Sequence, residues 1–144
     1  MKIRIQLENF DVSTELAALN HTRVGALVSF VGTVRADDGV THMELEHYPG
    51  MTEKCLTDIA MQAAQRWDIG DVVIIHRVGV LQAGEQIVLV ATASRHRGSA
   101  FAACEFIMDY LKTGAPFWKK EHGPEGAHWV DARSTDQTAL DKWR

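Results

Sequence analysis

Basic side chains are concentrated in one stretch of this 144-residue sequence, residues 94–121. One further basic side chain, Arg35, ends the apolar run that begins at residue 25. The cationic candidates for chemistry are Arg35, His96, Arg97, Lys112, Lys119 and Lys120. Most of them stand at the ends of predicted helices and strands, where functional sites are usually built. A guanidinium group donates two parallel hydrogen bonds to a phosphate or carboxylate, and a desolvated lysine can transfer a proton or act as a nucleophile. These residue types therefore predict that the chain binds and converts a phosphorylated metabolite.

The spacing of these groups predicts a single basic cleft. His96 and Arg97 end a buried strand, Lys112 ends the helix that follows, and Lys119 comes after a tight turn at Pro116. We expect the fold to bring all three positions around one cleft. The formal net charge of the chain is −4, which argues against a protein that binds nucleic acid through a general basic surface. The anion site must therefore be local.

Other kinds of site are disfavoured by the spacing of the polar residues. The pairs His42/His47 and His122/His128 lack the helical spacing of a zinc protease, and no carboxylate completes a recognisable ligand set. The chain has no GxGxxG or GxxxxGK[ST] phosphate loop and no GxSxG nucleophile elbow. We therefore expect no metal centre, no cofactor and no nucleotide site of the usual kinds.

Composition and length predict one compact domain over residues 1–144, since 46% of the residues are hydrophobic and 24% are charged. Cys55 and Cys104 fall inside predicted helices and are expected in the core rather than as ligands. Residues 1–7 alternate between apolar and polar, which argues against a signal peptide, and no run of eighteen apolar residues predicts a membrane span. A reducing, cytoplasmic setting is the expectation.

Hydrophobic periodicity predicts a mixed α+β fold in which helices pack on a largely antiparallel sheet. Strands are expected at residues 3–7, 25–35, 40–48, 72–79 and 87–93, and helices at residues 13–20, 52–67 and 99–112. Ser13 and Thr52 are the expected caps of the first two helices, and Gly114 is the expected end of the third. Gly32 is expected to mark a bulge or a close approach by another backbone or a ligand.

The order of these elements predicts which of them lie side by side. Strands 25–35 and 40–48 are expected to form an antiparallel hairpin around a turn at residues 37–39, and strands 72–79 and 87–93 to be neighbours. Phe101, Cys104, Met108 and Leu111 are expected to form the apolar stripe of the third helix. Residues 117–121 are expected to form a rigid loop or a short helical turn. Residues 122–144 are expected to be irregular, with a short strand around Trp129.

Seven runs, taken together and in order, resemble the large, catalytic subunit of molybdopterin synthase. They are FVGTVR (30–35), LEHYPGM (45–51), HRVG (76–79), SRHR (94–97), AF (100–101), MDYLK (108–112) and PFWKKE (116–121). Because the match covers nearly the whole chain, it is far more specific than any single motif. The resemblance implies an α/β hammerhead-type fold with a small added antiparallel subdomain.

The resemblance also implies a reaction and its partners. Members of this family transfer sulfur to cyclic pyranopterin monophosphate (precursor Z) and form the dithiolene of molybdopterin in molybdenum cofactor biosynthesis. The sulfur arrives as a glycine thiocarboxylate at the C-terminus of a small ubiquitin-like subunit, whose tail enters a pocket of the large subunit. Two large subunits form a homodimer with one small subunit at each end, which makes a heterotetramer. No persulfide on Cys55 or Cys104 is then required.

The family's site positions carry over to intact motifs of this chain. The implied substrate-binding residues are Thr33, Val34, Arg35, His96, Arg97, Lys112, Lys119, Lys120 and Glu121. Lys112 and Lys119 match the two critical lysines and are the implied catalytic residues, with Lys119 close to the incoming C-terminus. His96, Arg97 and Arg35 would hold the phosphate and the pterin, Arg35 from across the dimer. Lys120 is expected to point to a different side from its neighbour Lys119.

Two rival functions remain open from the residues alone. The basic cleft could belong to a non-catalytic module that captures an acidic peptide tail. Alternatively, a hydrolase of a small phosphorylated metabolite would use His96 as an acid or base and would need no thiocarboxylate partner. Met108, one helical turn before Lys112, is expected to pack in the core rather than line the pocket.

Overall fold

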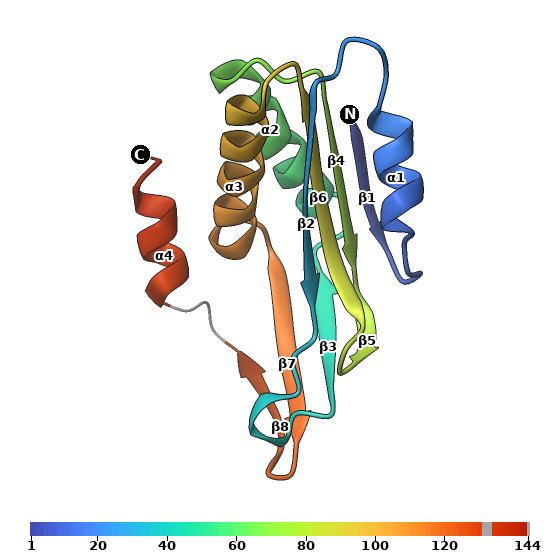
Figure 1. Ribbon diagram of the computed structural model, residues 1–144. Helices are drawn as coiled ribbons and strands as arrows, with labels where there is room; N and C mark the ends of the chain where they lie inside the picture. The colour runs from blue at the N-terminus through green and yellow to red at the C-terminus, as the bar shows by residue number, and fades with distance from the viewer. Residues whose placement is uncertain (131–133, 144) are drawn as a thin grey trace.

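The structure is a computed structural model that describes residues 1–130 and 134–143, and two four-stranded sheets organise it (Figure 1). The first sheet has the order β1 (Lys2–Gln6), β4 (Asp71–Arg77), β6 (Gln86–Ser94) and β2 (Ala26–Thr33). Only its β1/β4 pair is parallel. The second sheet has the order β5 (Gly79–Gln82), β3 (His42–His47), β7 (Phe117–Gly123) and β8 (Gly126–Val130), and all its pairs are antiparallel. The α+β fold with a small antiparallel second sheet is therefore confirmed.

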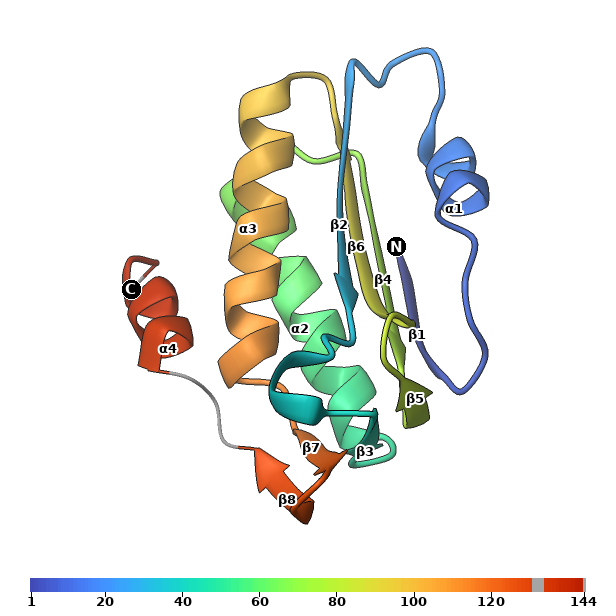
Figure 2. The same cartoon turned by 60° about the horizontal axis from the view of Figure 1, so that its bottom comes forward.

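Helices cover both faces of the first sheet (Figure 2). On one face lie α2 (Met51–Arg66) and α3 (Arg97–Thr113), and on the other lies α1 (Val12–Leu19). Strand β4 is buried along nearly its whole length because it is covered on both sides. The remaining helices are α4 (Ser134–Asp141), which packs on α3, and a short 3-10 turn, η1 (Asp37–Gly39). No helix in the described ranges is long and apolar enough to cross a membrane.

Two of the predicted helix caps are wrong, and each error has a local cause. Helix α1 begins after Asp11, whose carboxylate accepts the Thr14 N–H at 2.9 Å, so Ser13 lies inside the helix. Helix α2 begins after Gly50, and Thr52 lies in its first turn. The buried Thr52 hydroxyl accepts the backbone N–H of Tyr48 and donates to the Pro116 carbonyl at 3.1 Å. It therefore ties α2 to the turn that leads into β7.

The predicted hairpin of strands 25–35 and 40–48 is also wrong. Strand β2 pairs with β6 in the first sheet, whereas β3 pairs with β5 and β7 in the second. The register of β2 shifts at Gly32 and Thr33, which confirms the predicted bulge and lets the chain leave the first sheet. A Cβ added to Gly32 would lie 2.8 Å from a methyl carbon of Val88, so a side chain, rather than another backbone, approaches this glycine. The predicted neighbours β4 and β6 do pair.

The region after Pro116 is more regular than the sequence predicts. Residues 117–121 belong to β7 rather than to a loop or helical turn, and β8 follows it as a hairpin. Residues 134–141 form α4, while residues 131–133 and 144 lie outside the described part of the chain. Trp143 then packs on Phe106, and its indole N–H donates to the Asp109 carboxylate. Phe101 departs from the predicted apolar stripe of α3, because 60% of its surface is exposed.

Candidate functional site

A cavity of about 100 Å³ opens where the two sheets meet the end of α3, and we call it the lysine pocket. Its polar side chains are those of Thr33, His76, Lys112 and Lys119. The remaining lining is apolar or backbone and comes from Gly32, Leu45, Ile87, Val88, Leu111, Ala115 and Phe117. Two ammonium groups in a partly apolar cavity make it suited to an anionic reactant whose charge changes during a reaction.

Local structure explains why both lysines reach this pocket. Lys112 lies in the last turn of α3, where the helix dipole favours a cation, and Gly114 ends the helix as predicted. Lys119 is the third residue of β7 and lies opposite Leu45 of β3. Alternation along β7 directs its side chain to the same face as Phe117. The side chain of Lys112 is exposed and that of Lys119 is half-buried.

His76 is the pocket residue that the sequence analysis missed. It lies on β4, is 5% exposed, and stacks on Phe117 with 3.8 Å between the ring centroids. Burial lowers its pKa from 6.5 to about 4, and the positive charges of Lys112 and Lys119 add to the effect. The ring is therefore neutral at pH 7, with Nδ1 donating to the Arg77 carbonyl at 2.7 Å. A histidine inside the otherwise apolar run of β4 was the available signal.

His96 and Arg97 form a second basic site, at the opposite end of α3. An open hollow of about 450 Å³ is lined there by Gly25, Arg95, His96, Arg97 and Gly98, and we call it the arginine hollow. His96 precedes the first residue of α3, and no side chain caps the helix there. Unpaired N–H groups and the dipole of a helix N-terminus favour anions, and the arginines add charge. The hollow is therefore suited to hold a phosphate.

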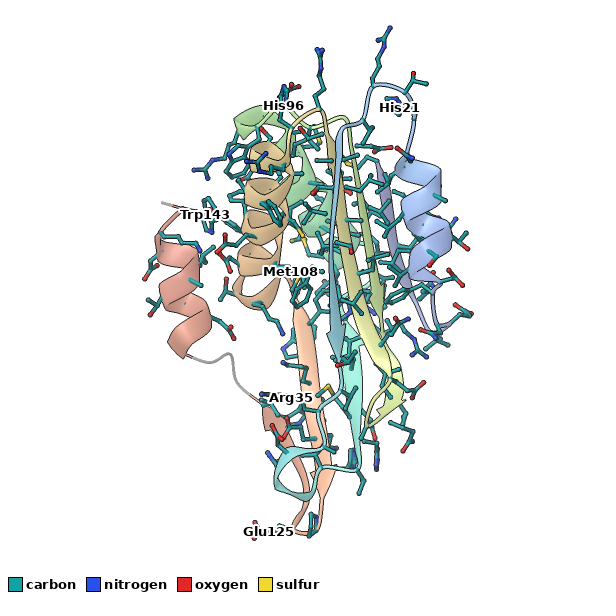
Figure 3. All side chains as sticks on the ribbon, in the orientation of Figure 1. His21, Arg35, His96, Met108, Glu125 and Trp143 are labelled. Atoms are coloured by element: carbon teal, nitrogen blue, oxygen red, sulfur yellow. The ribbon has the colours of Figure 1, made fainter. Side chains whose placement is uncertain are left out.

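The two basic sites are separated by the length of α3. The helix spans seventeen residues, which corresponds to about 25 Å at 1.5 Å per residue. Figure 3 shows His96 at one end of the molecule, with Met108 midway and Arg35 toward the other end. The prediction that Arg97, Lys112 and Lys119 surround one cleft is therefore wrong for a single copy of the chain.

Two other predicted site residues lie on the segment after β2 and differ in exposure. Val34 is 3% exposed and packs with Met43 and Leu81 in the core beneath the second sheet. Its backbone N–H and carbonyl are bonded to Glu85 and Gly84, so it can only position its neighbours. Arg35 is exposed, and its guanidinium lies 3.5 Å from the Asp37 carboxylate.

The last two predicted residues lie on β7. Lys120 faces away from Lys119, as expected, and its ammonium lies 5.4 Å from the centre of the Trp129 ring. Glu121 shares the face of Lys119 and is half-buried, with its carboxylate 3.7 Å from His128 Nε2. In one copy of the chain, neither side chain lines the lysine pocket.

Cys104, Met108 and Cys55 do not line the lysine pocket. Cys104 is buried, and burial raises the pKa of its thiol to about 11, so it stays protonated and unreactive. Met108 is 8% exposed and belongs to the main core, as predicted. Cys55 is half-buried, so the prediction that it lies in the core is only partly confirmed.

Known proteins match this chain in both sequence and structure. The family model described as "MoaE protein" matches residues 5–114. A molybdopterin synthase catalytic subunit from Ralstonia nicotianae is 61% identical over 98% of this chain and 83% of its own length. The solved structure of the molybdopterin biosynthesis MoaE protein from Burkholderia ambifaria MC40-6 is 61% identical, covers 99% of this chain and 97% of its own, and superposes with a TM-score of 0.86.

Two more distant structures share the fold. Molybdopterin synthase from Staphylococcus aureus is 32% identical with a TM-score of 0.83, over 88% of this chain and 95% of its own. A protein–protein complex of subunits 1 and 2 of molybdopterin-converting factor from Helicobacter pylori 26695 contains a chain with a TM-score of 0.75 and 20% identity. That chain covers 92% of both sequences.

Proposed function

This chain belongs to the MoaE family, and we propose that it acts as a molybdopterin synthase catalytic subunit whose lysine pocket transfers sulfur to precursor Z. The enzyme class, a sulfurtransferase of molybdenum cofactor biosynthesis, follows from its relatives. The observation that carries the site assignment is that Lys112 and Lys119 share one cavity with a neutral, buried His76. We propose the cytoplasm as its location.

The chemistry of sulfur transfer explains the need for two ammonium groups. Attack by the thiocarboxylate sulfur on a side-chain carbon of the pterin forms a C–S bond and breaks a C–O bond at that carbon. The departing oxygen takes the electron pair and needs a proton, which Lys112 or Lys119 can supply. Water then cleaves the acyl–sulfur bond, so that the donor leaves with an ordinary carboxylate. Positive charge in the pocket stabilises both the thiocarboxylate and the departing oxygen anion during the reaction.

We propose that the sulfur donor is the C-terminal glycine thiocarboxylate of a small ubiquitin-like subunit. The Helicobacter pylori relative in fold was solved as a complex of two subunits, which supports a partner of this kind. An extended tail needs a narrow cavity with a cation at its end, and the half-buried Lys119 is suited to that role.

We propose further that two copies of the chain complete each site, within a heterotetramer that holds one small subunit at each end. Strand β2 is at the edge of the first sheet among the described strands, and it exposes Leu27 and Phe30. Gly25, directly before this strand, lines the arginine hollow, and Thr33 at its end lines the lysine pocket. Antiparallel contact between two such strands would bring the arginine hollow of one copy to the lysine pocket of the other. His96 and Arg97 would then hold the phosphate, and Arg35 and Glu121 would border the joined site. Lys120 leaves the opposite face of β7 and would not line it.

Reconstitution tests the proposed activity. The purified chain is mixed with precursor Z and a thiocarboxylated small subunit, and the dithiolene product is measured. Product should form only when all three are present. A chain that forms no product would support the non-catalytic rival, and one that releases phosphate from precursor Z without the partner would support the hydrolase.

Sedimentation tests the proposed dimer. Phe30→Asp places a charge on the exposed edge of β2 and should convert dimers to monomers. Met61 on α2 is comparably exposed, at 49% against 40% for Phe30, so Met61→Asp is the matched control and should stay dimeric. A wild-type chain that sediments as a monomer would contradict the shared site.

A further inference from the structure

Three potential metal ligands converge on the outer face of the second sheet. His42 and Glu44 are two residues apart on β3, so their side chains leave the same face of the strand. His122 on β7 is the direct cross-strand partner of His42. This face is opposite to the one that carries Lys119, so the three residues are not part of the lysine pocket.

The distances between these side chains suit a shared ion. One ligand atom from each of His42, Glu44 and His122 can be chosen so that all three lie within 4.8 Å of one another. The two imidazole rings are stacked with 4.2 Å between their centroids, and His122 Nε2 lies 3.0 Å from a Glu44 carboxylate oxygen. This contact is too poorly aligned for a hydrogen bond, and Nε2 is a buried nitrogen that lacks a hydrogen-bond partner among the described residues.

A neighbouring hydroxyl prepares His42 for coordination. Thr41 Oγ1 donates its single proton to the His122 carbonyl at 3.3 Å and lies 2.9 Å from His42 Nδ1. When the hydroxyl donates to that carbonyl, its oxygen accepts from His42 Nδ1–H, which leaves the lone pair of the ring on Nε2. Orientation of a ligating imidazole through its other nitrogen is typical of metal sites.

We propose that His42, Glu44 and His122 form a binding site for Zn²⁺ or a similar divalent transition-metal ion. Two imidazoles and one carboxylate are ligands that zinc prefers, at bond lengths of about 2.0–2.2 Å. The rings must rotate out of their stack so that both lone pairs point to one ion, and both residues are only partly buried. Three protein ligands leave a fourth position for water or an outside ligand.

The competing explanation is an ion pair between Glu44 and a protonated His122. Two further residues face this site from the adjoining strands: Gln82 of β5 opposite His42, and Lys120 of β7 opposite Glu44. The Lys120 ammonium lies over the Trp129 ring of β8. The carboxylate of Glu44 has no hydrogen bond to Lys120 or Gln82 among those found in the described residues, which leaves it able to bind a cation.

Calorimetric titration of the tag-free, metal-free chain with ZnCl₂ tests the proposal, with Co²⁺ absorption as a second readout of ligand geometry. The wild-type chain should bind one equivalent. Loss of a residue that hydrogen-bonds to a metal ligand costs about 10–100-fold in metal affinity, and loss of the ligand itself costs more. His42→Ala and His122→Ala should therefore each weaken zinc binding by about 100-fold or more. Glu44→Gln should weaken it too, and Thr41→Val should cost about 10-fold.

His128→Ala is the matched control, because His128 is an exposed histidine on β8 that approaches Glu121 instead. It should bind zinc as the wild-type chain does. Circular dichroism checks that each variant is folded. If an alanine variant is unfolded, Glu44→Gln, the smallest change, is the deciding variant. Absence of binding to the wild-type chain, or equal affinity in the wild-type chain and the ligand variants, would overturn the site.

Discussion

The two ends of α3 carry basic groups in very different surroundings. At its C-terminal end, Lys112 and Lys119 line a small cavity assembled from both sheets and the helix, with the buried His76 in its wall. At its N-terminal end, His96 and Arg97 lie on a single exposed turn beside an open hollow. One end lines a cavity that is suited to a reaction, whereas the other is an open surface that is suited to hold an anion.

This contrast explains why one chain is not sufficient for the proposed reaction. Charges interact strongly where water is excluded and weakly at an open surface. In the proposed reaction, the lysine pocket would therefore supply proton transfer and charge stabilisation, and the arginine hollow would supply phosphate binding once a second surface covers it. The exposed strand β2, which connects the two sites, is suited to provide that cover.

The largest effect is expected in the lysine pocket. Lys112→Ala and Lys119→Ala should each lower single-turnover sulfur transfer by about 10²–10⁴-fold, because a positioned proton donor contributes that much. Binding of the small subunit, measured by calorimetry, should change far less. Lys54→Ala on the exposed surface of α2 is the control and should behave like the wild-type chain. If turnover and binding of the small subunit fell by the same factor, the result would instead support a non-catalytic module that binds a peptide tail.

A smaller effect is expected on stability through His76. Its pKa is lowered from 6.5 to about 4, so in this window the unfolded chain binds the proton and the folded chain does not. The free energy of unfolding should therefore fall by about 3 kcal/mol as the pH drops through this range. His76→Asn should lose that component of the pH dependence in urea unfolding series. Identical pH profiles for variant and wild type would show that His76 is not buried as a neutral ring.

The smallest effect is expected at the arginine hollow. Arg97→Ala should raise KM for precursor Z by about 10-fold with little change in kcat, because a phosphate contact is made in both the ground and transition states. Arg97→Lys should recover part of the loss. Arg23→Ala, a change on the exposed loop before β2, is the control. A fall in kcat at constant KM would place Arg97 in the chemical step and erase the contrast between the two ends.

Local patterns in the sequence were enough to predict many elements but not their partners. The alternation and β-branched residues of β2, β4 and β6 identified these strands, and Gly32 identified the bulge. The hairpin prediction failed because the bulge sends the chain from β2 into another sheet. Strand β7 was missed because its run KKE lacks β-branched residues, and its pairing with β3 is set by tertiary contacts.

The sequence named the candidate site residues but not their arrangement, and their roles stay predictions. Both lysines were identified, and the structure places them in one pocket. The distance between Arg97 and Lys112 was missed, because a strand end and a helix end that are close in sequence are far apart when the helix is long. The His42/His122 pair was missed for the opposite reason: eighty residues of sequence separate side chains that lie directly across two strands. The assignment of residues 1–144 to one domain stays a prediction.

The central claim, that one copy's lysine pocket works with the other copy's arginine hollow, is tested most directly by mixing two impaired variants at a precursor Z concentration well below KM. Lys112→Ala disables the lysine pocket. Arg97→Asp reverses a charge and disables the arginine hollow. In a mixed dimer, one site combines the intact Lys112 of one copy with the intact Arg97 of its partner. Random mixing should therefore restore about a quarter of wild-type sulfur transfer, since about half of the dimers are mixed and each has one intact site. Activity no higher than the average of the two variants, in samples shown to exchange subunits, would contradict the shared site.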